Sequence, residues 1–380
     1  MNRMKENHCP SFDSYWYTIA VPTPFGSPPG KRGFIRNSFS AGQRINVLFV
    51  PFLMLLLFFS SCNRNPLKVD ISDIKAEVEI VRFDQELFHA PMQDTLTELK
   101  KLRYRNPDFF DLFTWKIIGI GGMEEEHFPE AINEFLTDTM ILNVKSMVET
   151  KFSDFRKIEI RIIEAFKYYN YHFPEKELPT IFTMISGFNQ SVVTAENIIG
   201  ISLDKYLGRD CSYYKLLSNV PQYKTANMHP EKIPSDVAYA WGMTEFEEGE
   251  NTTTVLDHII HQGKLMYFVD ALLPEMHDTL KIGYTTLQLQ WCTENEPQMW
   301  NYLVEERMLY SNRRMDILRF INDGPYTNGF PLESPSRAGI WIGWQIVRQY
   351  MKKFPDITLP ELMLNTDYQK ILNDSQYYPE

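Results

Sequence analysis

The chain has few cysteines and fewer basic than acidic residues. Its 380 residues include 4 cysteines, and 38 Lys and Arg stand against 49 Asp and Glu, for a formal net charge of -11. So few cysteines exclude a disulfide-stapled scaffold. The acidic balance argues against nucleic acid as a partner, because nucleic acid is bound by clustered positive charge. CxxC, GxSxG, Walker A and GxGxxG motifs are absent too, so those metal-site and enzyme classes have no support.

One long hydrophobic run stands near the N-terminus, at residues 47–59 (VLFVPFLMLLLFF). It is too short for a membrane span, which takes about 20 residues. Basic residues precede it and Ser60-Ser61-Cys62 follows it, which is the layout of a secretory signal peptide. Two small residues directly before a cysteine are typical of a bacterial lipoprotein signal, which predicts that Cys62 is lipidated, with palmitate as one acyl chain. An ordinary signal peptide with Cys62 as a bystander, or a short buried helix, are the alternatives.

This leader sets the expected domain organisation. Residues 1–61 are interpreted as a signal peptide with an N-terminal extension, which is longer than signal peptides usually are and indicates a miscalled gene start. Residues 62–75 are interpreted as a lipid-anchored tether, and residues 76–380 as a single domain, since no repeat, low-complexity tract or linker divides them. Cys211 and Cys292 remain in this domain, at a spacing that favours two buried free thiols over a disulfide.

Hydrophobic periodicity predicts an α+β fold, mostly helical with a small mixed β-sheet. Alternating or β-branched apolar runs predict strands at 77–84, 179–186 and 197–202. Residues 204–210 (DKYLGRD) follow the last of these, and a structural turn is favoured there over a ligand-binding loop. Apolar residues at helical spacing, with capping residues and Pro or Gly at the ends, predict helices at 95–106, 153–171, 255–273, 297–310, 314–321, 336–353 and 358–364.

The most chemical-looking stretch is Asp257-His258-Ile259-Ile260-His261. It invites comparison with the zinc motif HExxH, in which two His four residues apart point at one metal and a Glu acts as general base. Here the two His are three apart, and the frame reads D-H-x-x-H. Asp257, His258 and His261 are therefore weak metal candidates, and two half-exposed histidines on a helix is the favoured interpretation. We expect no catalytic residue, metal or cofactor.

A second motif combines glycine and tryptophan. Gly339 and Gly343 lie four apart, with Trp341 and Trp344 beside them, and this spacing predicts close approach of another helix. Arg337 stands at the expected helix start, where the helix dipole disfavours a cation. It should therefore pair with a carboxylate, for which Glu305 and Glu306 are the candidates.

A set of segments runs in order over nearly the whole mature chain: Cys62, DIS (70–72), VRFD (81–84), LDKYLG (203–208), MHPE (228–231), GKLMYF (263–268), ERMLYS (306–311) and RAGIWIGWQIV (337–347). Together these segments resemble the gliding motility lipoprotein GldB family. The resemblance implies a lipoprotein of the bacterial cell envelope, anchored in a membrane, facing the periplasm and needed by the gliding machinery.

The C-terminal half also resembles a predicted zinc peptidase family with a zincin-like fold. In that family an HExxH helix precedes a Gly-rich helix that contains Trp, whereas here Asp257 stands for the first His and His258 for the Glu. We therefore hypothesise a zincin-like scaffold with a degenerate metal site. Five residues are expected to cluster around the former active-site groove: Gly263, Lys264, Tyr267, Glu306 and Arg337.

Three functions follow from these observations. The first is a non-enzymatic envelope lipoprotein, held to the membrane by its lipid anchor, that acts through other envelope or gliding-machinery proteins. The second is a metallopeptidase with an altered Asp257/His258/His261 site and Glu306 as a further ligand. The third is a lipoprotein that binds a peptide or glycan in an aromatic cleft formed by Trp241, Trp341 and Trp344.

Overall fold

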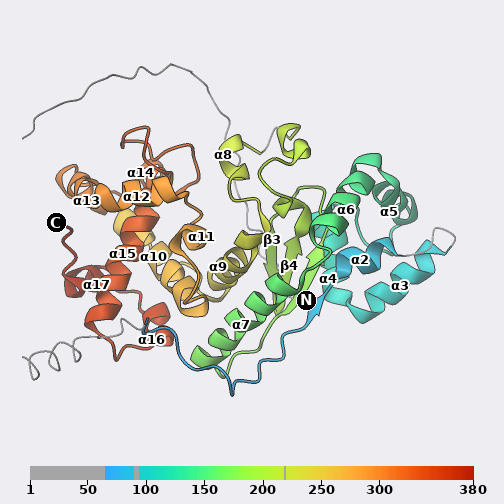
Figure 1. Cartoon of the computed structure of the whole chain (residues 1–380), viewed down its shortest axis with the longest axis horizontal. Helices are drawn as coiled ribbons and strands as arrows, with labels where there is room; N and C mark the ends of the chain where they lie inside the picture. Colours follow the sequence, from blue (N-terminus) through green and yellow to red (C-terminus); the bar gives the residue numbers. More distant parts are fainter. Residues whose placement is uncertain (1–64, 90–93, 218–219) are drawn as a thin grey trace, which may run out of the picture. The chain divides into compact units, whose positions relative to one another are not determined.

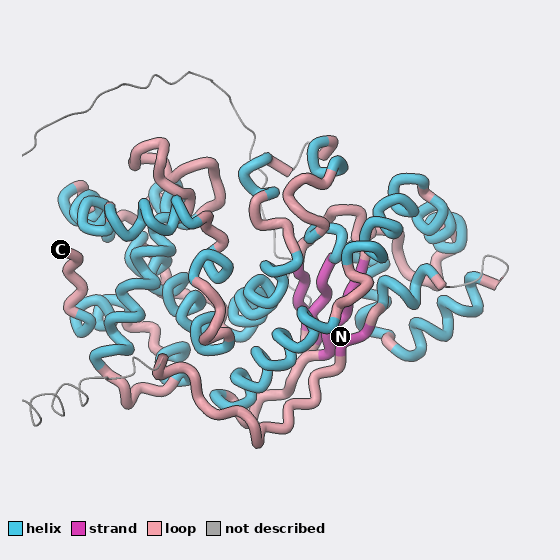
Figure 2. Tube along the Cα trace, viewed as in Figure 1, coloured by secondary structure: helices cyan, strands magenta, loops and turns pink. Residues whose placement is uncertain are grey.

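The computed structural model describes residues 65–89, 94–217 and 220–380 (Figure 1). Residues Asn63–Glu380 form one compact unit. Helices dominate this unit, and a single four-stranded sheet lies among them in the described residues (Figure 2). The predicted α+β class, mostly helical with a small mixed sheet, is therefore confirmed.

The sheet has the strand order β1-β2-β4-β3. The strands β1 (Ile80–Val81), β2 (Thr180–Met184) and β4 (Ile198–Ser202) are parallel, and β3 (Val192–Ala195) runs antiparallel to β4. The strands predicted at 179–186 and 197–202 are confirmed. The strand predicted at 77–84 is reduced to two residues, because α2 (Phe83–Phe88) begins directly after it. β3 was not predicted, because its run Val192-Val193-Thr194-Ala195 is only four residues long and closely follows the turn residues at 187–190.

Side chains of β2 point alternately into two apolar clusters. Phe182 and Met184 join the smaller cluster, where the ring of Phe109 stacks on Phe182 with 4.1 Å between centroids. Ile181 and Ile185 join the larger cluster. The sheet thus links the two cores, as the period-2 geometry of a strand requires. The smaller cluster is built by α2, α3 (Thr95–Arg105), α4 (Pro107–Leu112), the π-helical turn η1 (Phe113–Ile117) and α5 (Phe128–Thr137).

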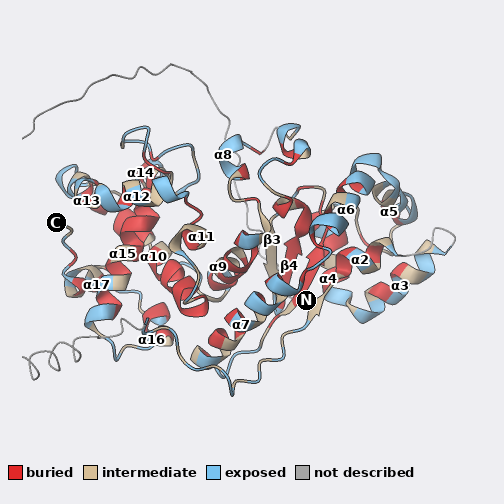
Figure 3. Ribbon diagram, viewed as in Figure 1, coloured by how far each residue is buried: buried red, intermediate tan, exposed pale blue. Residues whose placement is uncertain are grey.

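The larger cluster surrounds α10 (Val255–Leu272), whose residues are buried on nearly every side (Figure 3). A capping box at Thr254 and Asp257 starts this helix. The helix predicted at 255–273 is confirmed, as are those predicted at 314–321, 336–353 and 358–364. The larger helices packed on α10 are α7 (Arg156–His172), α9 (Ile233–Glu245) and α15 (Ala338–Lys353). α6 (Thr139–Lys151) adds Val144 and Val148 to the same cluster away from α10.

The remaining elements are short. They are α8 (Gln222–Thr225), α11 (Asp278–Ile282), α12 (Thr286–Glu294), α13 (Glu296–Glu305), α14 (Arg314–Ile321), α16 (Leu359–Leu364), α17 (Tyr368–Ser375), and the 3-10 turns η2 (Leu203–Tyr206), η3 (Ser212–Lys215), η4 (Pro230–Lys232) and η5 (Met308–Tyr310).

The backbones of α10 and α15 touch at a pair of glycines. A Cβ added to Gly263 would overlap the carbonyl oxygen of Gly343, and one added to Gly343 would overlap that of Ile259. One turn earlier in α15, a Cβ on Gly339 would lie 2.7 Å from the Cβ of Phe320. The close helix approach predicted from Gly339 and Gly343 is confirmed, and its partner is α10.

A buried ionic cluster joins α10, α11 and α15. The carboxylate of Asp270 accepts hydrogen bonds from Lys281 Nζ at 2.7 Å, from Arg348 Nε at 2.7 Å and from the indole nitrogen of Trp344 at 2.8 Å. Arg348 also donates to Asp278 at 2.7 Å. Asp270 and Lys281 are each only 4% exposed at the side chain, so each charge depends on the others for compensation.

Two further findings concern single groups and helix lengths. Cys211 and Cys292 are buried free thiols, which confirms the prediction for them. None of the helices in the described residues is long and apolar enough to cross a lipid bilayer. The predicted lipidation site, Cys62, and the signal peptide lie outside the described residues.

Candidate functional site

A cavity of about 530 Å³ lies next to the carboxyl ends of β2 and β4. β4 leads into η2, which contributes Lys205 and Tyr206, and the loop between β2 and β3 contributes Asn189 to Ser191. The carboxyl ends of parallel strands, where β2 and β4 both end, are a favoured place for ligands in such sheets. α8 and its flanks, the start of α9, the turn between α11 and α12 with the start of α12, the loop after α14 and the start of α15 also contribute.

The lining carries more positive than negative charge, and we therefore call this cavity the basic cavity. Two carboxylates, Asp236 and Asp323, face five cations, which leaves a net charge of +3 in a chain whose own net charge is -11. Low-dielectric walls of one sign concentrate a field and attract ions of the opposite sign. The five cations are Lys205, Arg209, Lys224, Lys232 and Arg337.

Asp204 fixes the loop beneath the cavity. This carboxylate is completely buried and accepts hydrogen bonds from the backbone N–H groups of Ser186 and Phe188. Burial raises the pKa of Asp204, and the backbone hydrogen bonds oppose that rise. Lys205, the next residue, turns its Nζ to the carbonyl oxygen of Phe188 at 3.2 Å. Burial lowers the pKa of Lys205 and the charge of Asp204 opposes that effect.

Lys232 and Asp236 form a closed pair at the start of α9. The buried Lys232 donates to Asp236 at 2.6 Å and to the hydroxyl of Ser235 at 3.0 Å. The second carboxylate oxygen of Asp236 accepts the hydroxyl of Tyr206 at 2.8 Å. The charge of Lys232 is therefore compensated within the protein, and so is that of Asp236.

Arg337 also lines the cavity, in a left-handed backbone conformation with φ of 60°. Its Nε lies 3.0 Å from the carboxylate of Asp323, and its Nη2 donates to the carbonyl oxygen of Ile282 at 2.8 Å. The prediction that Arg337 needs a carboxylate is confirmed, but Glu305 and Glu306 as its partners are wrong. Those two acids end α13, whereas the side chain of Arg337 reaches the turn after α11 and the loop after α14.

The structure does not bring the five residues predicted to surround a groove into one site. Arg337 lines the basic cavity, and the other four do not. Gly263 is at the α10–α15 crossing and Glu306 is exposed at the end of α13. Lys264 is buried and donates to the carbonyl oxygens of Met363 at 2.9 Å and Asn365 at 2.7 Å. Burial lowers the pKa of Lys264 to about 8. Tyr267 is buried too, which raises its pKa to about 12.

The three metal candidates serve other purposes in the structure. Asp257 accepts the backbone N–H groups of Thr254 at 2.8 Å and Thr253 at 3.1 Å as the helix cap. His258 lies 3.2 Å from the carboxylate of Glu248. His261 is buried rather than half exposed, and burial lowers its pKa to about 4. Across the described ranges, no group of three or more His, Cys, Asp or Glu is arranged to hold a metal ion.

The predicted aromatic cleft is wrong. Trp241, Trp341 and Trp344 are 2%, 5% and 0% exposed and belong to the larger apolar cluster. A large aromatic side chain buries well over 100 Å² of surface, so its burial in the apolar core is strongly favourable.

Sequence reasoning missed most of the basic cavity. Lys205 and Arg209 lie in the segment 204–210, where a structural turn was favoured, and the mixture of charge and glycine directly after a strand was the available signal. The other cations come from segments far away in the sequence, and no periodicity connects them.

A family model described as gliding motility protein GldB matches residues 64–379 of the chain. No match was found among curated proteins or among solved structures.

Proposed function

The chain belongs to the GldB family of gliding motility proteins, and on this premise we propose that it is a lipoprotein anchored through Cys62 that acts through protein partners and not as an enzyme. The observation that carries the proposal is the extent of the match, which covers residues 64–379 and so begins directly after the predicted lipidation site. The lipoprotein-type signal before Cys62 supports the anchor, and through it a periplasmic-facing place in the cell envelope.

The bonds made by the metal candidates support a non-enzymatic role. A peptidase site needs ligands that are free to converge on one ion and an open position for water. Here the carboxylate of Asp257 is taken by backbone N–H groups, and His258 is bonded to Glu248. We propose that the scaffold is zincin-like with a degenerate metal site. The packing of α10 against the Gly- and Trp-containing α15 supports this assignment, because the resembling peptidases place their motif helix before such a helix.

The anchor is tested in the native host. A deletion strain is complemented with the wild-type gene or with Cys62→Ala, and palmitate labelling, membrane fractionation and colony spreading are measured. We expect Cys62→Ala to abolish labelling and to impair spreading. Labelling that survives in Cys62→Ala would overturn the anchor assignment.

The non-enzymatic role is tested by metal content and complementation. We expect the purified protein to hold zinc far below one equivalent, and the variant His258→Gln to restore spreading as well as the wild type does. Cross-linking in intact cells followed by purification should recover envelope proteins with the wild-type protein. One equivalent of zinc that is lost in His258→Gln, together with peptide cleavage, would contradict the proposal and favour the metallopeptidase.

A further inference from the structure

We propose that the basic cavity binds the phosphate group of a small, hydroxyl-bearing ligand, and that Lys205, Arg209 and Arg337 hold that phosphate. This site is independent of the anchor and of the partner surface proposed above. The argument rests on which charges the protein compensates by itself, on the uncharged lining, and on the size of the cavity.

The charges in the cavity are only partly compensated. Asp236 is engaged by Lys232 and Tyr206, and Asp323 is shared between Arg337 at 3.0 Å and Lys224 at 3.6 Å. In the described part of the chain, neither Lys205 nor Arg209 forms an ion pair with a carboxylate. Lys205 therefore has only the buried charge of Asp204 nearby, Arg209 has no ion-pair partner among the described residues, and Arg337 shares Asp323 with Lys224.

A phosphate fits this arrangement better than a single carboxylate does. Its charge of up to -2 is attracted by the net charge of +3 in the cavity lining, and its three terminal oxygens accept hydrogen bonds from several donors at once. The guanidinium of Arg209 can bind phosphate through paired N–H groups. Arg337, which is already held by Asp323 and the carbonyl oxygen of Ile282, adds positive charge. Lys205 is half buried in the cavity lining, where burial lowers its pKa and a bound anion restores the stability of its charged form.

The uncharged lining indicates what the phosphate is attached to. Gln190 and Gln222 are exposed at the cavity, and no hydrogen bond to another described residue occupies their side-chain amides. Each amide offers a donor and an acceptor, which suits hydroxyl groups. Tyr223 adds an aromatic surface. The volume of about 530 Å³ lies within the range of small-molecule sites.

A long polyanion is a poor candidate for the same cavity. The chain has a net charge of -11, so segments of nucleic acid outside the cavity would meet a predominantly acidic protein. A small ligand places its negative charge inside the cavity and leaves little of it elsewhere. Phosphate with neighbouring hydroxyls occurs on free sugar phosphates and on phosphoglycerol headgroups of lipids, and two soluble probes separate these sources.

Calorimetric titration of the detergent-solubilised full-length protein tests the proposal. At low ionic strength and pH 7, glucose 6-phosphate or glycerol 3-phosphate should bind more tightly than inorganic phosphate, and glucose should not bind measurably. The tighter of the two phosphorylated probes identifies the source of the ligand. The double variant Lys205→Gln/Arg209→Gln should weaken that binding by about tenfold or more, since it removes two positive charges and their hydrogen bonds to the phosphate.

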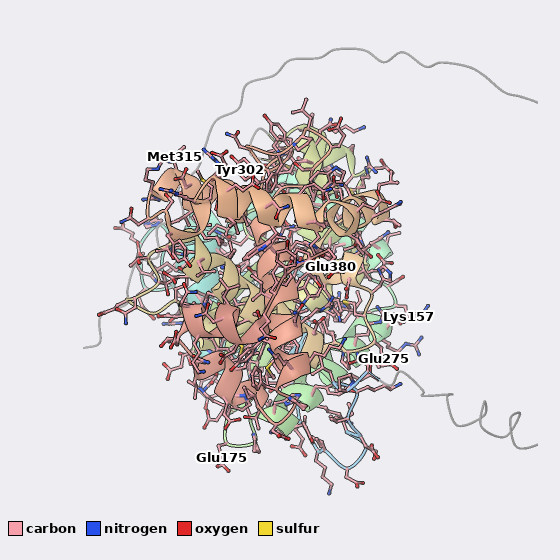
Figure 4. All side chains as sticks on the ribbon, turned by 90° about the vertical axis from the view of Figure 1, so that its left-hand side faces the viewer. Lys157, Glu175, Glu275, Tyr302, Met315 and Glu380 are labelled. Atoms are coloured by element: carbon pink, nitrogen blue, oxygen red, sulfur yellow. The ribbon has the colours of Figure 1, made fainter. Side chains whose placement is uncertain are left out.

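A matched control removes the same charge elsewhere. Lys157, at the surface of α7 (Figure 4), and Arg314, at the start of α14, are both exposed and outside the basic cavity. Lys157→Gln/Arg314→Gln should leave the dissociation constant within about twofold, because a charge that stands in water outside the cavity interacts only weakly with a ligand inside it. Binding weakened equally by both double variants would overturn the proposal, as would binding of inorganic phosphate as tight as that of both other probes, or no binding at all. Arg209→Gln alone, at an exposed position, keeps the test decisive if Lys205→Gln unfolds the protein.

Discussion

Gly263 and Gly343 determine how closely α10 and α15 approach each other. Each lies where a Cβ would overlap a backbone carbonyl of the other helix. Because backbone atoms cannot rotate away as a flexible side chain does, a larger residue at either position must separate the helices. Close packing in protein interiors makes such a separation costly along the whole interface.

At the residue scale, Gly263→Ala is expected to destabilise the protein by about 3 kcal/mol or more, the upper range for an overpacked core. Urea unfolding followed by circular dichroism measures the change. Gly249→Ala is the control, because a Cβ there would meet nothing closer than Thr366 at 3.9 Å. Its effect should stay within about 0.5 kcal/mol. Equal stability of Gly263→Ala and the wild type would contradict the packing described.

Arg337 shows how far single residues can be predicted. The helix dipole argument foresaw a carboxylate partner, which is a local matter of charge at a helix end. The partner is Asp323, in a loop between α14 and α15 that has no periodicity from which its path could be predicted. The need for a carboxylate beside Arg337 was therefore predictable from the sequence, whereas which carboxylate fills that place depends on the tertiary structure.

At the scale of elements, the three helices around Asp270 meet in a charged and buried cluster. Asp270→Ala would leave Lys281 and Arg348 to share the carboxylate of Asp278, at 3.8 and 2.7 Å, so the cluster would hold two cations and one anion in surroundings where uncompensated charge is strongly unfavourable. The loss is expected to be about 3–5 kcal/mol. Thermal and urea unfolding check this, with Asp374→Ala, which removes an exposed i,i+4 pair with Lys370, as the control. That control should lose less than about 1 kcal/mol.

The end of α7 gives a pH dependence. Burial lowers the pKa of His172 to about 4, below the value of about 6.5 for an unfolded chain. Between these values the unfolded state binds more protons, so the free energy of unfolding falls as the pH falls from 6.5 to 4. His172 contributes up to about 3 kcal/mol of that loss.

Urea unfolding at pH 7, 5.5 and 4.5 tests this, and His172→Gln should show a shallower decline than the wild type. His261, with its pKa also near 4, keeps part of the slope in that variant. His277→Gln serves as the control, since that ring belongs to an exposed helix cap. An unchanged slope in His172→Gln would show that its ring titrates normally.

Elements differed in how well the sequence predicted them. α10, α14, α15 and α16 have strong apolar periodicity or clear caps, and their predicted bounds were right to within about two residues. β3 and the π-helical turn η1 have neither, because half-buried edges and irregular turns are stabilised by what packs on them.

At the scale of the molecule, β2 connects the two apolar clusters, and we expect them to unfold together. Phe109→Ala removes the ring stacked on Phe182 and should cost about 3–5 kcal/mol. In a Trp115→Phe background, four of the remaining tryptophans belong to the larger cluster, so their fluorescence reports the other side of the sheet: Trp241, Trp300, Trp341 and Trp344.

In Phe109→Ala, the urea midpoint of the fluorescence transition should be lower than in the parent protein, and it should coincide with the midpoint measured by far-UV circular dichroism. Tyr104→Ala, at an 88% exposed position of α3, should shift neither. A fluorescence midpoint that stays unchanged in Phe109→Ala would show that the clusters unfold independently.

The basic cavity marks the limit of prediction at this scale. The fold class and the family could be inferred from local patterns and from motifs in order along the chain. The cavity is lined by residues between 189 and 337, contributed by loops that meet only once the sheet and α10 are in place. Long-range proximity of that kind is not encoded in any one segment.

The first described residues have a mechanical consequence. Asn65 donates to the carbonyl oxygen of Pro274, Lys68 pairs with Glu275, and β1 then adds Ile80 and Val81 to the edge of the sheet. A pulling force applied to the chain at Asn65 is therefore borne in series, first at the end of α10 and then at the sheet. The contacts near Pro274 must break before the force acts on the hydrogen bonds of β1.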